Sequence, residues 1–314
     1  MLKGSGDSLL AIDLSPDVVR VLDVTLQRGM PVIGAIASGP LAEGGLDTLP
    51  ERQMDALEKV LETNRIKRRK CVAAVPTNVV TTRSVMIDLT KPQTPEEQVH
   101  NLLQNISSVN AKDMLFDFWQ TSPSEADERS YEVLVVATQK SIIHRYLSGF
   151  ERLKLSCTHL DVSPCALASL MGRLVPTESL VGTVVLGETL GYFAVVDKDR
   201  VMFWRPFDLP KNGAQAGLER VGDEISKCVS HMVGTLHLDS MMDIYLFGSN
   251  AQDEKFGAYL SHRFNMKVKS PSPFELFKDQ KVTPELEAVM QSPTASQYAA
   301  ALGLALQPAG GVNG

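Results

Sequence analysis

Two short polar turns carry the side chains with which this chain could hold a phosphate group. Asp13 ends an apolar strand, Ser15 lies in the turn that follows, and Arg20 comes just beyond it. A tight strand-turn-strand can direct backbone N–H groups at a phosphate, and a nearby carboxylate can hold the accompanying Mg²⁺ through water. Comparable groups occur at the turn Gly187-Glu188-Thr189 and at the strand end Gly248-Ser249. Each turn taken singly is also compatible with ordinary turn chemistry.

The first two of these turns belong to a pattern that the chain contains twice. Three predicted antiparallel strands make up each copy, over 9–14, 18–24 and 31–38 in the first and over 183–186, 190–196 and 201–207 in the second. In both copies the first turn is polar and helix-forming sequence follows the third strand. The repeat predicts two similar lobes that face each other across a cleft. Chance recurrence of a common motif is the alternative.

Composition limits the class of protein. A chain of 314 residues is long enough for two lobes, and its net charge of −6 argues against a nucleic-acid-binding surface. The N-terminus lacks the apolar core of a signal peptide, and no segment reaches the roughly 18 apolar residues that span a bilayer. The four cysteines show no C-x-x-C spacing, which favours free thiols in a reducing cytosol. We therefore expect a cytoplasmic protein that does not itself insert into a membrane.

Several kinds of catalytic site are excluded because their motifs are absent. The sequence has no Walker A motif, no strand-linked G-x-G-x-x-G, no G-x-S-x-G elbow and no H-E-x-x-H. None of the six histidines has a partner at the spacing of a metal site. The sequence thus predicts no catalytic residue, and no metal ligand except Asp13.

Inside the first lobe, the sequence changes from predicted strands to a strong helix start, which predicts an inserted αββα unit. Its first helix begins at Thr94-Pro95-Glu96-Glu97, where a capping residue precedes proline and acidic side chains. Two strands, over 114–121 and 131–138, and a second helix over 140–153 follow. The predicted division is 1–83 with 161–180 for the first lobe, 84–160 for the insertion, 181–306 for the second lobe and 307–314 for a disordered tail.

The order of these features resembles the actin-like ATPase superfamily, and within it the PilM family of type IV pilus assembly proteins. The resemblance covers about residues 9–306 and is carried by the opening strand and turn over 10–23, Val72–Pro76, the insertion with Pro95-Glu96-Glu97 and Phe116-Asp117-Phe118, Leu160–Leu167 and the closing helix Tyr298–Leu306. The insertion is similar to the small subdomain shared with FtsA. The resemblance implies an α/β, actin-like (ribonuclease H-like) fold with two lobes and an inserted small subdomain.

The resemblance also implies a nucleotide site, with ATP and Mg²⁺ as cofactors. The residues that it assigns to this site are Asp13, Ser15, Arg20, Gly187, Thr189, Glu224, Lys227, Gly248 and Ser249, with Asp13 as the contact to Mg²⁺.

Four departures from the family pattern fall in that site. Leu14-Ser15-Pro16 replaces a turn with glycine, and Pro16 removes a backbone donor. Val185 stands where the second phosphate turn has aspartate, Gly248-Ser249 replaces a glycine pair, and Lys227-Cys228-Val229 replaces Arg-Ser-Leu. Because the second aspartate is missing, we expect no enzyme, or at most a very slow ATPase. Nucleotide binding without turnover and no binding at all are both left open.

The function implied by the resemblance is that of a cytoplasmic scaffold in type IV pilus or related secretion machinery. Its implied partner is the N-terminal cytoplasmic peptide of a PilN-like inner-membrane protein, which would recruit the chain to that membrane; self-association is left open. The peptide groove is expected between the insertion and the first lobe, with Phe116, Phe118 and Trp119 as candidate walls. Since side chains alternate along a strand, at least one alternating pair of the insertion strand must face the insertion's own core.

Two other functions remain as alternatives. An FtsA-like cell-division protein, or an actin-like protein of another assembly, is the first, although the tail over 308–314 does not form the amphipathic membrane helix of FtsA relatives. A nucleotide-dependent ATPase or sugar kinase is the second. It requires a catalytic carboxylate at the second turn, where Glu188 is the candidate.

Overall fold

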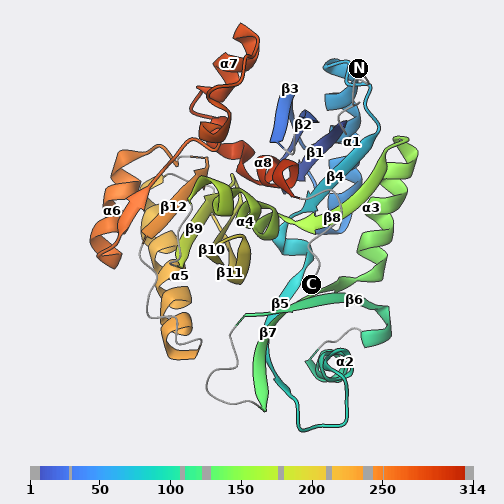
Figure 1. The fold of residues 1–314 in the computed structure, drawn as a ribbon, viewed down its shortest axis with the longest axis vertical. Coiled ribbons are helices and arrows are strands. Elements are labelled where there is room, and N and C mark those ends of the chain that lie inside the picture. The colour runs from blue at the N-terminus through green and yellow to red at the C-terminus, as the bar shows by residue number, and fades with distance from the viewer. Residues whose placement is uncertain are drawn as a thin grey trace.

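The computed structural model describes residues 8–27, 30–106, 110–121, 129–175, 180–209, 214–235, 243–249 and 251–307. Two five-stranded sheets form the centres of two lobes, and a three-stranded sheet forms a smaller unit below them in Figure 1. The tail predicted over 307–314 lies outside the described residues except for Gln307.

The first lobe is built on a sheet with the strand order β3-β2-β1-β4-β8. Its antiparallel meander consists of β1 (Ser8–Leu14), β2 (Val18–Gln27) and β3 (Met30–Pro40), and β4 (Lys70–Val75) and β8 (Ser156–Val162) continue it in parallel. The helices of this lobe are α1 (Leu49–Thr63) and α3 (Lys140–Arg152). Helix α4 (Ser163–Leu174) follows β8 and packs against β4 and β8 as well as against two strands of the second lobe, β10 (Leu190–Asp197) and β11 (Arg200–Asp208). Continuous apolar runs such as Leu9–Ile12 suit a sheet that is covered on both faces.

The second lobe repeats this arrangement with the strand order β11-β10-β9-β12-β13. Its meander consists of β9 (Val181–Leu186), β10 (Leu190–Asp197) and β11 (Arg200–Asp208), and β12 (Asp243–Gly248) and β13 (Lys267–Lys269) are parallel additions. Its helices are α5 (Ala214–Thr235) and α6 (Glu254–Phe264), whereas α7 (Pro284–Met290) packs against β3 of the first lobe. The duplicated meander predicted from the sequence is confirmed.

The closing helix α8 (Ala299–Leu306) follows the second lobe in the chain but packs against α4 and against β1, β2 and β4 of the first lobe. The crossing of α8 over α4 is close because residue 303 is glycine. A Cβ at Gly303 would lie 2.5 Å from the carbonyl carbon of Ala166. Helix α8 was predicted as part of the second lobe, over 181–306, but it belongs to the core of the first lobe.

The inserted unit consists of β5 (Thr81–Asp88), α2 (Pro95–Ile106), β6 (Met114–Gln120) and β7 (Ser130–Gln139), with the strand order β5-β7-β6. Its own core lies between α2 and one face of the sheet and includes Ile87, Val99, Val133 and Val135. Leu134, between the two valines, faces the other way and joins the core of the lobes.

The limits of the insertion differ from the predicted 84–160. Strand β5 already belongs to the small sheet, whereas β8 pairs with β4 in the first lobe. Helix α3 packs on α1: Tyr146 and Phe150 enter the core of the lobes, and Arg152 pairs with Asp55 at 2.8 Å and with Glu58 at 3.0 Å. The αββα description is therefore corrected to βαββ, because the partners of α3 and β8 are distant in sequence.

Candidate functional site

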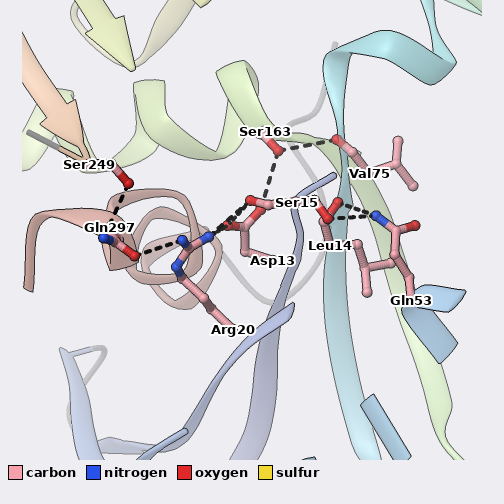
Figure 2. Close-up of polar contacts among 9 residues, drawn as sticks. All are labelled: Asp13, Leu14, Ser15, Arg20, Gln53, Val75, Ser163, Ser249 and Gln297. Atoms are coloured by element: carbon pink, nitrogen blue, oxygen red, sulfur yellow. Dashed lines mark hydrogen bonds and ion pairs between the residues drawn. The ribbon is translucent and has the colours of Figure 1, made fainter. Parts of the chain in front are cut away.

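Asp13 lies at the end of β1, where only 2% of its surface is exposed. Figure 2 shows that polar side chains converge on its carboxylate. Ser15 Oγ donates to Oδ2 at 2.8 Å, Ser163 Oγ donates to Oδ1 at 3.4 Å, and the Arg20 guanidinium lies 3.5 Å from Oδ2. Burial raises the pKa of Asp13, while Arg20 and the two hydroxyl groups act in the opposite direction. Both carboxylate oxygens are thus engaged by the protein.

Arg20 connects the first turn to the segment that precedes α8. It lies opposite Asp13 in the β1–β2 register, and its Nη1 donates to Ser15 Oγ at 3.1 Å. Its Nη2 donates to Gln297 Oε1 at 2.8 Å, and Gln297 Nε2 donates to Ser249 Oγ at 3.3 Å. The guanidinium is therefore held by both sides of the cleft.

The turn of the second meander is bound by a side chain of the first. The Asp17 carboxylate accepts a hydrogen bond from the Thr189 backbone N–H at 3.0 Å and from its hydroxyl at 2.8 and 3.0 Å. Within the turn, the Gly187 N–H donates to the Leu190 carbonyl at 2.9 Å. The two predicted phosphate turns thus bind each other across the cleft.

The glycine at the end of β12 is required by the backbone. Gly248 has φ of +92°, and a Cβ there would lie 2.8 Å from the Leu186 carbonyl carbon. Its N–H donates to Ser296 Oγ at 3.2 Å, and the next N–H, of Ser249, donates to the Leu186 carbonyl at 2.6 Å. Glu224 and Lys227 on α5, which the resemblance assigned to the nucleotide site, do not line the cleft and instead pair with each other at 2.6 Å.

The cleft between the two turns is nearly closed, with a volume of about 60 Å³. Sites for drug-sized ligands usually measure roughly 300–1,000 Å³. Arg20 places a positive charge beside Asp13, which opposes a cation there, and Asp17 uses the donors of Thr189. In this arrangement the residues do not fit Mg-ATP. Two buried hydroxyl groups in the cleft lack a partner among the described residues, those of Tyr192 and Thr77, and burial raises the pKa of Tyr192.

Sequence reasoning missed the buried amide that supports the first turn. Gln53 on α1 is fully buried, and its Nε2 donates to the carbonyl oxygens of Leu14 at 2.7 Å and Ser15 at 2.9 Å (Figure 2). Its Oε1 accepts from the Tyr146 hydroxyl at 2.7 Å. Its place beside Met54 on the buried, otherwise apolar face of α1 was a usable signal in the sequence, because a buried amide needs partners.

A second hollow, of about 720 Å³, lies between β5 of the insertion and β11 of the second lobe. Both are edge strands of their sheets. The residues that line this β5–β11 groove are Thr77, Val80, Thr81, Thr82, Arg83, Ser84, Met86, Glu132, Leu134, Phe203, Trp204, Arg205 and Pro206. Trp204 is 1% exposed, and its indole Nε1 has no hydrogen-bond partner in the described part of the chain; the same holds for the buried Thr77 hydroxyl.

The three aromatic residues predicted for the peptide groove are separated by the pleat of β6. Phe116 and Phe118 pack against the insertion's own core. Trp119 points to the opposite face, stacks on Trp204 with ring centroids 6.2 Å apart, and donates its Nε1–H to the Val201 carbonyl at 2.7 Å. Trp119 thus joins the insertion to the second lobe, and none of the three lines the β5–β11 groove.

Comparisons with known proteins agree on one family and one fold. The family described as type IV pilus assembly protein PilM matches residues 11–216. A solved PilM-PilN type IV pilus biogenesis complex is 19% identical, with a TM-score of 0.72, and the match covers 95% of this chain and 97% of the other. Among curated proteins, the search found no match.

More distant structures share the fold. The cytoplasmic domain of EpsL, an inner-membrane component of the type II secretion system of Vibrio cholerae, is 12% identical over 88% of each chain, with a TM-score of 0.50. A Bacteroides thetaiotaomicron protein with an actin-like ATPase fold and unknown function is 11% identical over 88% of this chain and 98% of its own, with a TM-score of 0.51. The predicted actin-like fold is confirmed. No helix in the described ranges is long and apolar enough to cross a membrane.

Proposed function

The chain belongs to the PilM family of type IV pilus assembly proteins, and on that basis we propose that it is a scaffold that binds a peptide and turns over no nucleotide. The proposed partner is the N-terminal cytoplasmic peptide of a PilN-like protein, which would hold the chain at the inner membrane. A solved PilM-PilN complex with the same fold supports this choice of partner.

The observation that carries the proposal is the β5–β11 groove. An exposed strand edge offers unpaired backbone groups, and an extended peptide can add to it as a further strand. Here two edges face one hollow, and Leu134, Phe203 and Pro206 contribute apolar walls. A buried donor without a partner costs about 1–3 kcal/mol. A peptide carbonyl that accepts from Trp204 Nε1 would remove that cost.

This assignment moves the proposed groove from its predicted position. The sequence predicted a groove between the insertion and the first lobe, whereas the β5–β11 groove has the second lobe as its other wall and only Thr77 and Val80 from the segment that leads out of the first lobe. The contact between Trp119 and Trp204 fills one part of the boundary between the insertion and the second lobe. The proposed peptide therefore contacts the insertion and the second lobe together.

The proposal of no turnover is supported by the cleft. Val185 stands in place of the second aspartate, and Asp13 is bound to Arg20. Hydrolysis requires a group that positions water near the terminal phosphate. Glu188, the remaining carboxylate of the second turn, is exposed on the rim. We accordingly propose a degenerate nucleotide site.

The test is a titration of the full chain with a synthetic N-terminal peptide of the PilN-like protein from the same organism. Trp204 lines the groove, and Trp119, the only other tryptophan in the sequence, stacks on Trp204, so intrinsic fluorescence reports binding directly. Saturable binding is expected. Met86→Glu should weaken it at least tenfold, because Met86 lines the groove and is 59% exposed.

Leu89 supplies the matched control. It is 54% exposed and follows the same strand, but it does not line the groove, so Leu89→Glu should leave the affinity unchanged. Thermal melting of both variants checks that the fold is intact. Equal affinities for the wild type and Met86→Glu would contradict the assignment of the groove.

A further inference from the structure

Basic side chains gather where the chain enters the two parallel strands of the first sheet. Strand β4 begins at Lys70 and β8 at Ser156; the two are register partners, and the Ser156 N–H donates to the Arg69 carbonyl at 2.7 Å. The run 67–70 precedes and opens β4, and Lys154 precedes β8. Figure 1 shows that both strands begin at the end of the first lobe that lies away from the insertion. The pairing of β4 with β8 therefore brings two separate basic segments together.

The two helices that lead to these strands end in the same way. Arg65 follows α1 and Lys154 follows α3, and each has φ of +54°. The next residues, Ile66 and Leu155, are buried, and their N–H groups donate back to the last helical turn at 2.9 and 2.8 Å. Glycine is the usual residue in this helix ending, because the left-handed backbone is costly for a residue with Cβ. Here an exposed basic residue stands at both positions instead.

Neighbouring acids neutralise only part of the positive charge. Arg68 pairs with Asp23 at 2.5 Å, and Arg152 pairs with two acids of α1. The exposed acids of the same two segments are Glu62 and Glu151. Four basic residues are exposed and form no ion pair within the described part of the chain, and we call them the basic end: Arg65, Lys67, Arg69 and Lys154. This surface therefore keeps an excess of positive charge.

We propose that the basic end is a docking surface for a bilayer that contains anionic phospholipids. Several Lys and Arg side chains on one surface attract such a bilayer without the insertion of an apolar segment. A nucleic acid is the poorer fit, because domains that bind one are usually basic as a whole, whereas the net charge of this chain is −6. The inference adds a direct contact with lipid to recruitment by a partner. It requires neither the β5–β11 groove nor the cleft, so it and the proposed function can fail separately.

The test is cosedimentation of the full chain with vesicles of phosphatidylcholine, prepared with and without phosphatidylglycerol. Binding is expected only with phosphatidylglycerol, and it should weaken at high salt because exposed charges are screened. Lys154→Gly should lower the affinity about fivefold, and Arg65→Gly combined with Lys154→Gly should lower it at least tenfold. Because glycine adopts the left-handed backbone without strain, thermal melting of these variants should show no loss of stability. A loss of binding then reflects the lost charge and not a damaged fold.

Lys198→Gly is the matched control. Lys198 is also basic, exposed and left-handed, with φ of +56°, but it lies between Asp197 and Asp199 in the second lobe. The substitution removes the same charge and relieves the same kind of backbone strain, so vesicle binding should stay at the wild-type level. The inference is overturned if the wild type does not bind phosphatidylglycerol vesicles, or if Lys198→Gly weakens binding as much as Lys154→Gly. Equal binding to vesicles without phosphatidylglycerol, or equally tight binding to duplex DNA, would also overturn it.

Discussion

Replacing Gly303 with alanine should destabilise the protein strongly, because the new methyl group would enter the backbone of α4. A Cβ at this position would lie 2.5 Å from the Ala166 carbonyl carbon, 3.2 Å from the Leu167 nitrogen, and closer still to the Ala166 oxygen. Ordinary contact begins at 3.4 Å, so the two helices must separate by about 1 Å or more. Overpacking of this kind costs about 3 kcal/mol, and the better helix propensity of alanine returns about 1 kcal/mol. The expected net loss is about 2 kcal/mol or more.

The same substitution at Gly257 in α6 provides the control. Its nearest neighbour would be Val268 Cγ1 at 4.0 Å, so alanine fits and should stabilise the protein by up to about 1 kcal/mol. Urea unfolding followed by circular dichroism measures both variants against the wild type. If Gly303→Ala stays within about 0.5 kcal/mol of the wild type, α8 does not pack on α4 as described, and the placement of Gln297 against Arg20 loses its support.

Two further predictions concern the residues around Asp13. Gln53→Leu should lower the free energy of unfolding in urea by about 2–4 kcal/mol, because it leaves the Leu14 carbonyl and the Tyr146 hydroxyl unpaired. Tyr146→Phe should lower it by less. Equal losses for the two variants would contradict this hydrogen-bond network. Arg20→Met should raise the pKa of Asp13 further, since it removes the charge that opposes the effect of burial. A carboxyl with a raised pKa binds its proton more tightly in the folded state, so this variant should lose stability as pH rises above the unfolded-state pKa. Carbon-13 NMR titration of the carboxyl measures the change, and an unchanged or lower pKa would refute it.

The parts of the fold that the sequence predicted well are those set by local patterns. The meander strands alternate with polar turns over short spans, so β1 and β10 could be placed from their own residues and their neighbours. The start of α2 followed from Thr94, whose side chain does accept from the Glu97 N–H at 3.2 Å. Resemblance to a family then supplied the arrangement of the two lobes.

The parts that failed depend on partners far away in the chain. The assignment of β8 to the first lobe rests on its pairing with β4, some 86 positions earlier at Cys71 and Cys157, and no local signal specifies that register. The contact between Asp17 and Thr189 joins two turns whose own sequences suggested phosphate binding. A pattern of residue types identifies donors and acceptors, but it does not show that they are paired with one another.

The distribution of satisfied and unsatisfied polar groups ranks the two candidate sites. In the cleft, a phosphate ligand must first displace Asp17 from Thr189, and each charge-assisted hydrogen bond that it breaks offsets what it gains. In the β5–β11 groove, Trp204 Nε1 and the Thr77 hydroxyl are buried and without partners in the described chain, so a peptide gains hydrogen bonds without breaking any at these atoms. Thr77 lines both cavities. The wild-type chain should therefore bind a peptide more readily than a nucleotide, which is the order expected of a scaffold.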